Sequence, residues 1–208
     1  MYIFRLEPYK KTKVKVYFDE GDPAFVLYKK EIEKYDIREG QELSEETYDE
    51  ILNEILIKRA VSRTLYLLDA SAKTESQIRR KLKEGFYPQE AIDAAVRYAG
   101  SKHYIDDEYY ASAFAQQKLA SKSKQMVRKE LLQRGIDPDT VGKALEDAGT
   151  DDKETIRKLI IKKYPPGTEL DAKEAAKLMR SLSSKGFYYE DIRAEMEDLH
   201  IDITYNSD

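Results

Sequence analysis

Two groups of Lys and Arg residues are the part of this sequence best suited to bind a ligand. Both lie in the middle of the chain, and their charges could hold phosphate groups or acidic side chains. The first group consists of Arg79, Arg80, Lys81 and Lys83. The second group consists of Lys118, Lys122, Lys124, Arg128, Lys129 and Arg134. The same residues also suit the solvated outer face of a helix, so their pattern alone leaves both interpretations open.

The sequence offers little for a catalytic or metal-binding interpretation. Asp107 and Glu108 are adjacent acids, but no histidine, glycine-rich loop or second acidic cluster accompanies them. They fit the first turn of a helix, where the helix dipole favours carboxylates. The histidines, His103 and His200, stand far apart, and no cysteine is present. With no nucleophile or phosphate-binding motif either, we expect no enzymatic activity, no cofactor and no metal.

The charge of the chain is unevenly distributed. Residues 1–57 contain nine Lys and Arg against 14 Asp and Glu, residues 58–150 contain 17 against 13, and residues 151–208 contain 10 against 13. The net charge of −4 for the whole chain therefore hides segments of −5, +4 and −3. This distribution favours the middle segment, and not the ends, for contact with a polyanion or an acidic groove.

An apolar pattern recurs three times, at intervals of about 50 residues, which is typical of a helical array. Each copy has two apolar pairs spaced four residues apart, with a glycine between the pairs. The copies are Ile78, Leu82, Gly85, Ile92 and Val96; Val127, Leu131, Gly135, Val141 and Leu145; and Leu178, Leu182, Gly186, Ile192 and Met196. This spacing predicts two short helices joined at a glycine in the left-handed conformation.

Such a pair of helices cannot bury both of its apolar stripes, so a third helix must precede each pair. We expect these helices over about residues 58–70, 106–120 and 152–164. Their inward-facing side chains would be Leu65 and Leu68, Tyr110 and Phe114, and Ile156, Leu159 and Ile160. The predicted fold is mostly α-helical, an elongated array of three tandem three-helix repeats. Its expected segments are an extension over 1–57 and repeats over 58–100, 101–150 and 151–208.

Residues 1–57 predict a small β-sheet and a helix. Strands are expected over residues 1–6, 13–18 and 24–28, followed by one or two helical turns over 29–35. Ser44 fits the N-cap of a helix that continues into the first repeat near Lys58. Thr74 fits a capping box with Gln77, and Pro88 fits the N1 position of the next helix. The polar tail, residues 202–208, is expected to fray.

Three segments together resemble a known family. They are KEGF at residues 83–86, YIDDEYYASAF at residues 104–114 and VRKELLQRGI at residues 127–136. This combination is similar to the RecX family of bacterial regulatory proteins, over about residues 58–200. The N-terminal sheet resembles the extension of some members. Two residues depart from the family pattern: His103 stands where members usually have Gly, and Tyr109 where they often have Arg. The glycine that many members carry before the second helix is also replaced, within residues 121–124.

The resemblance implies a cytoplasmic, non-enzymatic protein of tandem three-helix repeats that binds the RecA recombinase. Members of the family lie in the groove of the RecA filament on single-stranded DNA and restrain its strand-exchange, co-protease and ATPase activities. On this interpretation the two groups of cations face acidic protein surface or the DNA backbone. A monomer that repeats its contacts could bridge adjacent subunits of the filament, so that weak ion pairs add through effective concentration.

Two alternatives remain open. Three-helix units with a basic middle segment also suit a module that binds DNA on its own, with a steep salt dependence. The 16 tyrosines would instead suit an adaptor for other helical proteins. No apolar run approaches the roughly 18 residues of a membrane-spanning helix, and no signal-like start is present, so we expect a soluble protein without membrane contact.

Overall fold

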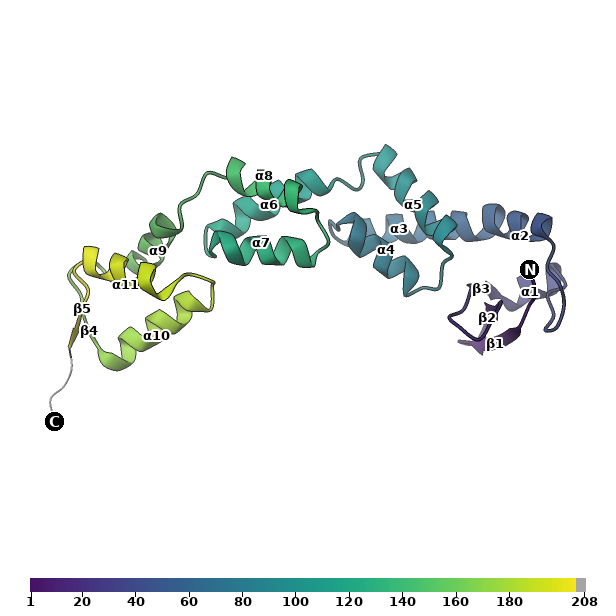
Figure 1. The fold of residues 1–208 in the computed structure, drawn as a ribbon, viewed down its shortest axis with the longest axis horizontal. Coiled ribbons are helices and arrows are strands. Elements are labelled where there is room, and N and C mark those ends of the chain that lie inside the picture. The colour runs from purple at the N-terminus through teal and green to yellow at the C-terminus, as the bar shows by residue number, and fades with distance from the viewer. Residues whose placement is uncertain (205–208) are drawn as a thin grey trace. The chain divides into compact units, whose positions relative to one another are not determined.

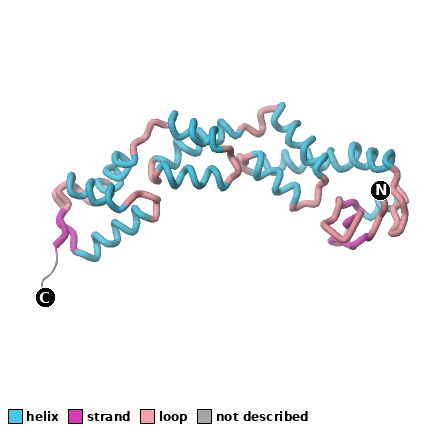
Figure 2. Tube along the Cα trace, in the orientation of Figure 1, coloured by secondary structure: helices cyan, strands magenta, loops and turns pink. Residues whose placement is uncertain are grey.

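The computed structural model describes residues 1–204. The chain divides into two compact units, of which the first ends at Asp106 and the second begins at Asp107. Helices make up most of both units (Figures 1 and 2). Within the described residues, strands occur near the beginning of the first unit and in the third domain of the second unit. The prediction of a mostly helical chain with a small N-terminal sheet is confirmed.

The sheet of the first unit has three antiparallel strands in the order β1-β2-β3. These are β1 Arg5–Tyr9, β2 Lys13–Tyr17 and β3 Phe25–Tyr28, and the short helix α1 Lys29–Lys34 follows directly. The first strand lies later than predicted. Met1 and Ile3 instead pair their backbones with the segment before Ser44: the amide of Ile3 donates to the carbonyl of Gln41 (2.9 Å).

One uninterrupted helical stretch links the extension to the first repeat. It consists of α2 Glu45–Ile51, a π-helical segment η1 Leu52–Ile57 and α3 Lys58–Ala70. The Ser44 hydroxyl accepts a hydrogen bond from the amide of Thr47 (3.1 Å), so the predicted N-cap is confirmed. The buried residues Ile51 of α2 and Leu56 of η1 belong to the same hydrophobic core as Phe25 of the sheet and Ile78 of the first repeat. The sheet and the first three-helix domain therefore share one core.

Three tandem three-helix domains follow, as predicted. The first contains α3, α4 Glu75–Lys83 and α5 Gln89–Ser101; the second contains α6 Asp107–Leu119, α7 Lys124–Gln133 and α8 Pro138–Asp147; the third contains α9 Asp152–Ile161, α10 Ala172–Ser183 and α11 Tyr189–Asp198. The capping box of Thr74 and Gln77 is confirmed. Pro88 is the N-cap of α5, so its predicted N1 position is wrong. The residue limits that we expected for the four segments stay predictions.

Small side chains lie at the centre of the first two domains, where we expected large ones. The buried residues of α6 are Ala111, Ala115 and Leu119, whereas Tyr110 and Phe114 are half-buried beside them. Likewise α3 buries Ala60, Thr64 and Leu67, and Leu65 and Leu68 are half-buried. Alanine lets the first and third helices of a domain approach closely, and the larger side chains then pack at the edge of the core. In the third domain Ile156 and Ile160 are buried as predicted, and Leu159 is half-buried.

A left-handed residue joins the second and third helices of every domain. Gly135 (φ +80°) and Gly186 (φ +90°) take this conformation, as predicted. In the first domain the left-handed residue is Phe86 (φ +60°), so the assignment to Gly85 is wrong. In all three turns the amide of the left-handed residue donates to the carbonyl three residues earlier, at 2.9 Å. The next amide donates to the carbonyl five residues earlier, at 3.3–3.4 Å, which completes a Schellman motif.

The third domain contains a feature that the sequence did not predict. After the loop at Tyr164 to Gly167, strand β4 Glu169–Asp171 pairs in parallel with β5 Asp202–Thr204. Leu170 is buried in the core of this domain, and Ile203 packs against it. The expectation that the tail frays is therefore wrong for Asp202 to Thr204, and residues 205–208 lie outside the described part of the chain.

The third helix of each domain also ends at a left-handed residue. These residues are His103 (φ +54°), Gly149 (φ +60°) and His200 (φ +54°). The amide of His103 donates to the carbonyl of Gly100 (2.9 Å), and that of Tyr104 to the carbonyl of Ala99 (2.9 Å). This geometry gives a physical reason for a glycine at position 103, because a side chain at positive φ costs energy that glycine does not.

We therefore predict that His103→Gly stabilises the first unit by about 0.5–1 kcal/mol, since relief of the left-handed strain exceeds the added entropy of the unfolded chain. Urea unfolding of the full chain, with hydrogen exchange to assign the change to residues 1–106, measures the effect. Gly135→Ala is the opposite control and should destabilise the second unit by a similar amount. An unchanged or lower stability of His103→Gly would contradict the strain argument.

Candidate functional site

Three of the ten predicted cations are held by polar partners inside the protein. Arg79 lies between two carboxylates, with Nε 2.7 Å from Glu75 and Nη1 2.5 Å from Asp93. The hydrogen bond with Asp93 raises the pKa of Arg79 and lowers that of the Asp93 carboxyl. Lys122 forms an ion pair with half-buried Glu130. Arg134 donates from Nε to the Tyr110 hydroxyl (3.2 Å) and from Nη1 to the Glu130 carbonyl (2.9 Å). Arg79 thereby joins α4 to α5, Arg134 joins the end of α7 to α6, and Lys122 joins the loop before α7 to that helix.

Aromatic contacts hold two of the cations in the second domain. The guanidinium of Arg134 lies 4.4 Å from the ring centre of Phe114. The ammonium group of Lys118 lies 5.7 Å from the same ring. Phe114 in turn stacks on Tyr110, with ring centres 6.1 Å apart. Arg134 thus joins the end of α7 to α6, whereas the contact of Lys118 with Phe114 lies within α6.

The other cations of the first group are more open. Lys81 and Arg80 both approach Glu84, at 2.8 Å and 3.9 Å. Exposed ion pairs of this kind contribute roughly 0–1 kcal/mol and exchange readily for another partner. Lys83 has no acidic partner within 4.0 Å among residues 1–204. Three cations of α4, Arg80, Lys81 and Lys83, are therefore available to an external partner, while Arg79 is held by Glu75 and Asp93.

Lys124, Arg128 and Lys129 form an unpaired basic face on α7. All three side chains are exposed, and in the described chain none has an acidic side chain within 4.0 Å. Ser123 caps this helix by accepting a hydrogen bond from the amide of Met126 (3.1 Å). The amide of Lys124 donates to the Asp152 carboxylate (3.0 Å). Burial raises the pKa of Asp152, and this amide opposes the shift.

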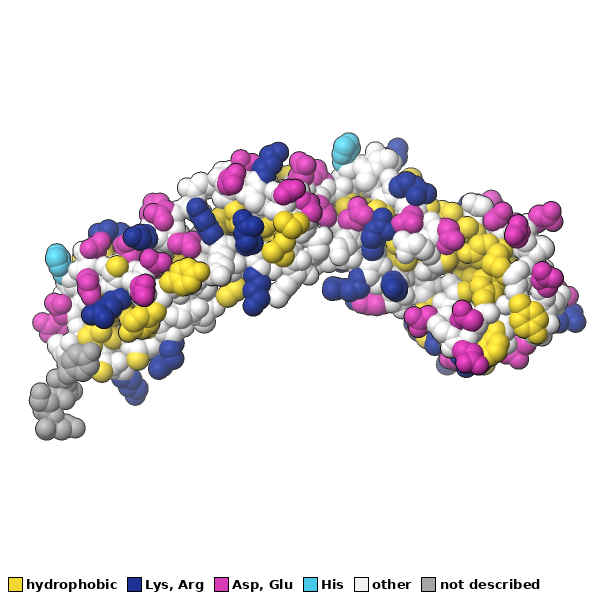
Figure 3. Space-filling model, viewed as in Figure 1, with side chains coloured by type: hydrophobic (Ala, Val, Ile, Leu, Met, Phe, Trp, Pro, Cys, Tyr) yellow, Lys and Arg dark blue, Asp and Glu magenta, His cyan; other side chains and the backbone are white. Residues whose placement is uncertain are grey.

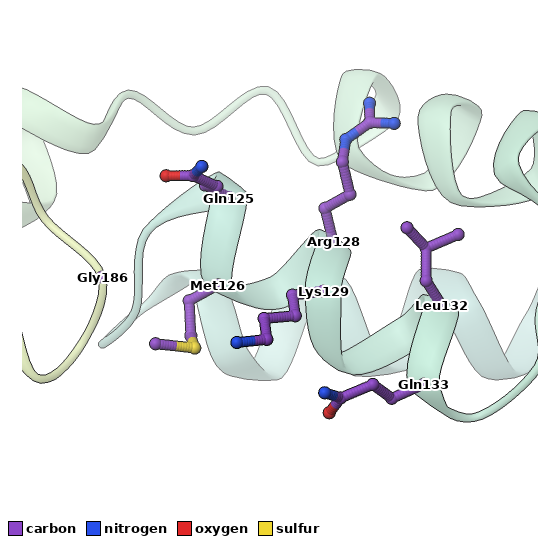
Figure 4. A pocket seen from close by; sticks show the side chains of 7 residues that line it. All are labelled: Gln125, Met126, Arg128, Lys129, Leu132, Gln133 and Gly186. Carbon is purple, nitrogen blue, oxygen red and sulfur yellow. The ribbon is translucent and has the colours of Figure 1, made fainter.

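A shallow, largely apolar hollow of about 640 Å³ lies along the same face. Figure 4 shows Met126 and Lys129 extending along α7 toward the loop that carries Gly186, with Arg128 and Leu132 farther along the helix. Leu132 is 40% exposed although it is a large apolar residue. On the face drawn in Figure 3, Lys and Arg side chains over α7 border an apolar patch. We call this surface, Lys124, Arg128 and Lys129 with Met126 and Leu132, the α7 face.

The second and third domains build this hollow together. A Cβ atom on Gly186 would lie 2.5 Å from the Ser123 hydroxyl and 2.8 Å from Cβ of Met126, so only glycine fits there. The amide of Ser123 donates to the carbonyl of Lys185 (3.1 Å). The Tyr188 hydroxyl donates to Oε1 of Gln125 (2.9 Å). The turn of the third domain is therefore fixed against the start of α7.

Sequence reasoning found the cations of the α7 face but missed its apolar part. Leu132 follows the buried Leu131 directly, so it lies off the inward stripe of Val127 and Leu131. An apolar residue off that stripe was the available signal. Within residues 1–204, no helix is long and apolar enough to cross a membrane, and no three His, Asp or Glu side chains are grouped to hold a metal ion.

Comparison with protein families accounts for each three-helix domain. Residues 60–98, 106–145 and 151–196 match the first, second and third three-helix domains of RecX, respectively. The chain belongs to the RecX family. This is a family of regulatory proteins and not of enzymes.

Relatives in the RecX family match the chain over most of its length. The regulatory protein RecX of Caldanaerobacter subterraneus subsp. tengcongensis is 33% identical over 186 residues, which cover 88% of this chain and 91% of that protein. The RecX of Clostridium botulinum strain Alaska E43 is 31% identical over 197 residues, 92% of each chain. A crystal structure of a regulatory protein RecX covers 94% of this chain and 98% of its own, at 25% identity and a TM-score of 0.56.

Cations that are bonded within the protein and cations that are unpaired should differ in how much their substitution lowers stability. Arg134→Ala should lower the free energy of unfolding by about 1–3 kcal/mol, because it removes hydrogen bonds of a charged group and a cation–π contact. Arg128→Ala, on the exposed face of α7, is the matched control and should change the free energy of unfolding by less than about 0.5 kcal/mol. Urea unfolding measures both. Equal effects of the two substitutions would show that this distinction is wrong.

Proposed function

We propose that this chain regulates the RecA recombinase by binding the RecA filament on single-stranded DNA. It would lie in the filament groove and restrain recombinase, ATPase and co-protease activity, and so act in DNA repair and the SOS response. Membership of the RecX family and the name "Regulatory protein RecX" of its relatives support this proposal. The protein would act in the cytoplasm as a monomer, without a cofactor.

The α7 face is the observation that carries the proposal at the level of residues. A merely solvated helix needs no exposed apolar side chain beside its cations, yet Leu132 is 40% exposed and borders the hollow. Unpaired cations steer a partner of opposite charge, and a desolvated apolar centre supplies affinity. This combination suits a protein surface with carboxylates around an apolar side chain, which we propose RecA provides.

A regulator of this kind needs several weak contacts and no reaction centre. Lys83 and the exchangeable Arg80 and Lys81 of α4 offer a second set of cations for the filament. Contacts from different domains of one chain add through effective concentration once the first has formed. If they span neighbouring RecA subunits, they resist the subunit movements that ATP turnover needs. Arg79, Lys122 and Arg134 leave the proposed contact set because they are engaged within their domains, and Lys118 leaves it because it lies over the ring of Phe114.

The combined variant Lys124→Glu, Arg128→Glu and Lys129→Glu tests the α7 face. We expect the concentration that half-inhibits the RecA ATPase on single-stranded DNA to rise at least about tenfold, because like charges then face the acidic partner. Lys173→Glu, Lys177→Glu and Arg180→Glu on α10 form the matched control, since these side chains are also exposed and the net charge changes equally. The control should inhibit as the native chain does.

Leu132→Ser separates the apolar contribution from the charge. It should weaken inhibition without changing the fold, which far-ultraviolet circular dichroism checks. Inhibition by the α7 triple variant at the native concentration would remove the α7 face from the proposal. No effect of the native chain on the RecA ATPase would overturn the proposed function itself.

A further inference from the structure

A second hollow lies in the first unit, and Lys81 is the one residue of its lining that the sequence analysis assigned to a site. It has a volume of about 440 Å³ and is bounded by the β1–β2 turn, by α3 and by the turn between α4 and α5. The sheet and these helices share one hydrophobic core, so the walls are fixed relative to one another. Five of its lining residues are cations and one is an acid: Lys10, Lys13, Arg59, Arg63, Lys81 and Glu84. We call this feature the basic hollow.

Three of these cations have no acidic partner. Arg59 is paired with Glu31, and Lys81 with Glu84 (2.8 Å). Over the whole described chain, by contrast, no carboxylate lies within 4.0 Å of the charged groups of Lys10, Lys13 or Arg63. They come from a turn, a strand and a helix, so the fold alone brings them together. A cluster of like charges that the protein does not neutralise favours an anionic ligand.

Aromatic rings hold two of the unpaired cations of the basic hollow in place. Lys10 lies 5.1 Å from the ring centre of Tyr9, and Lys13 lies 5.0 Å from that of Tyr28. Burial raises the pKa of the Tyr87 hydroxyl, which also lines the hollow, and the charges of Arg59 and Arg63 oppose this shift.

We propose that the basic hollow binds the phosphodiester backbone of a single-stranded nucleic acid directly. Arg63 on α3 presents a guanidinium that can hold a phosphate through two hydrogen bonds, while Lys10 and Lys13 of the β1–β2 hairpin add point charges. Tyr9 and Phe86, which contact each other edge to face at 5.7 Å, supply aromatic surface beside the cations. Cations next to aromatic rings are the usual means of binding single strands without sequence preference.

The lining of the basic hollow favours a single strand over a duplex and over an acidic peptide. Its cations come from a hairpin and from two helical segments around one recess, which we expect a flexible backbone to enter more readily than a rigid double helix. A carboxylate-rich peptide would need the cations alone, whereas Tyr9, Phe86 and Tyr87 also line the recess. This site is separate from the α7 face, and the inference does not depend on the proposed action on RecA.

The test measures binding of the full chain to a labelled oligothymidylate of about 15 nucleotides, without RecA, by fluorescence anisotropy at several salt concentrations. In Lys10→Glu with Arg63→Glu, we expect Kd to rise at least about tenfold and the salt slope to fall by about 1.4, two phosphate contacts' worth. Lys30→Glu with Lys102→Glu changes the net charge equally at exposed positions outside the hollow and should bind as the native chain does.

Each outcome supports or overturns the proposal. Lys10→Gln with Arg63→Gln, a milder change for the fold, should weaken binding in the same direction, and the α7 triple variant should retain it. Native affinity of the Glu variant, equal losses in its control, tighter binding of a duplex of the same length, or equal competition by polyglutamate would each overturn it. Loss of RecA inhibition with intact binding to the oligothymidylate would instead concern the proposed function alone.

Discussion

The left-handed turn between the second and third helices of each domain is the constraint on which the rest of the structure depends. It reverses the chain within a few residues and directs the next side chain, half-buried Tyr87 or buried Ile136 or Phe187, toward the core. The same turn also builds both candidate sites. Gly186 lets the turn of the third domain contact Met126 at one end of the α7 face. In the first domain the equivalent position is Phe86, whose ring contacts Tyr9 and closes one wall of the basic hollow.

Much of the fold can be predicted from the spacing of apolar residues and from helix caps in the sequence. The i, i+4 apolar pairs such as Ile78 and Leu82, and the caps at Ser44 and Thr74, appear in the structure as expected. The wrong predictions of core residues and of the tail have a common cause. Tertiary packing decides which of several locally equivalent residues is buried or paired. Alanines 111 and 115 fill the closest helix contact, where Tyr110 and Phe114 seemed the better core residues. Strand β5 forms because β4, some thirty residues earlier, offers its edge to a polar tail.

The candidate sites were harder to predict than the fold, since a cation looks the same in sequence whether its partner is within the protein or outside it. Asp93 lies 14 residues from Arg79, and Tyr110 lies 24 residues from Arg134, so only the folded chain reveals that both cations are engaged. The basic hollow could not be predicted because its cations come together only in the folded chain. Its unpaired cations are scattered from Lys10 to Arg63, and two of them lie in a segment whose net charge is negative.

The continuous helical stretch from α2 through η1 into α3 limits how this architecture can evolve. A repeat protein ordinarily lengthens by duplicating one module and splicing the copy between two others. Before Lys58 such a splice would cut a helix in mid-turn and separate Ile51 and Leu56 from the core that they share with Ile78. The loop that follows α5, residues 102–106, contains no helix that continues from one domain into the next. A new module is therefore admissible directly after the first domain, whereas one inserted between the second and third domains would separate Ser123 from Lys185.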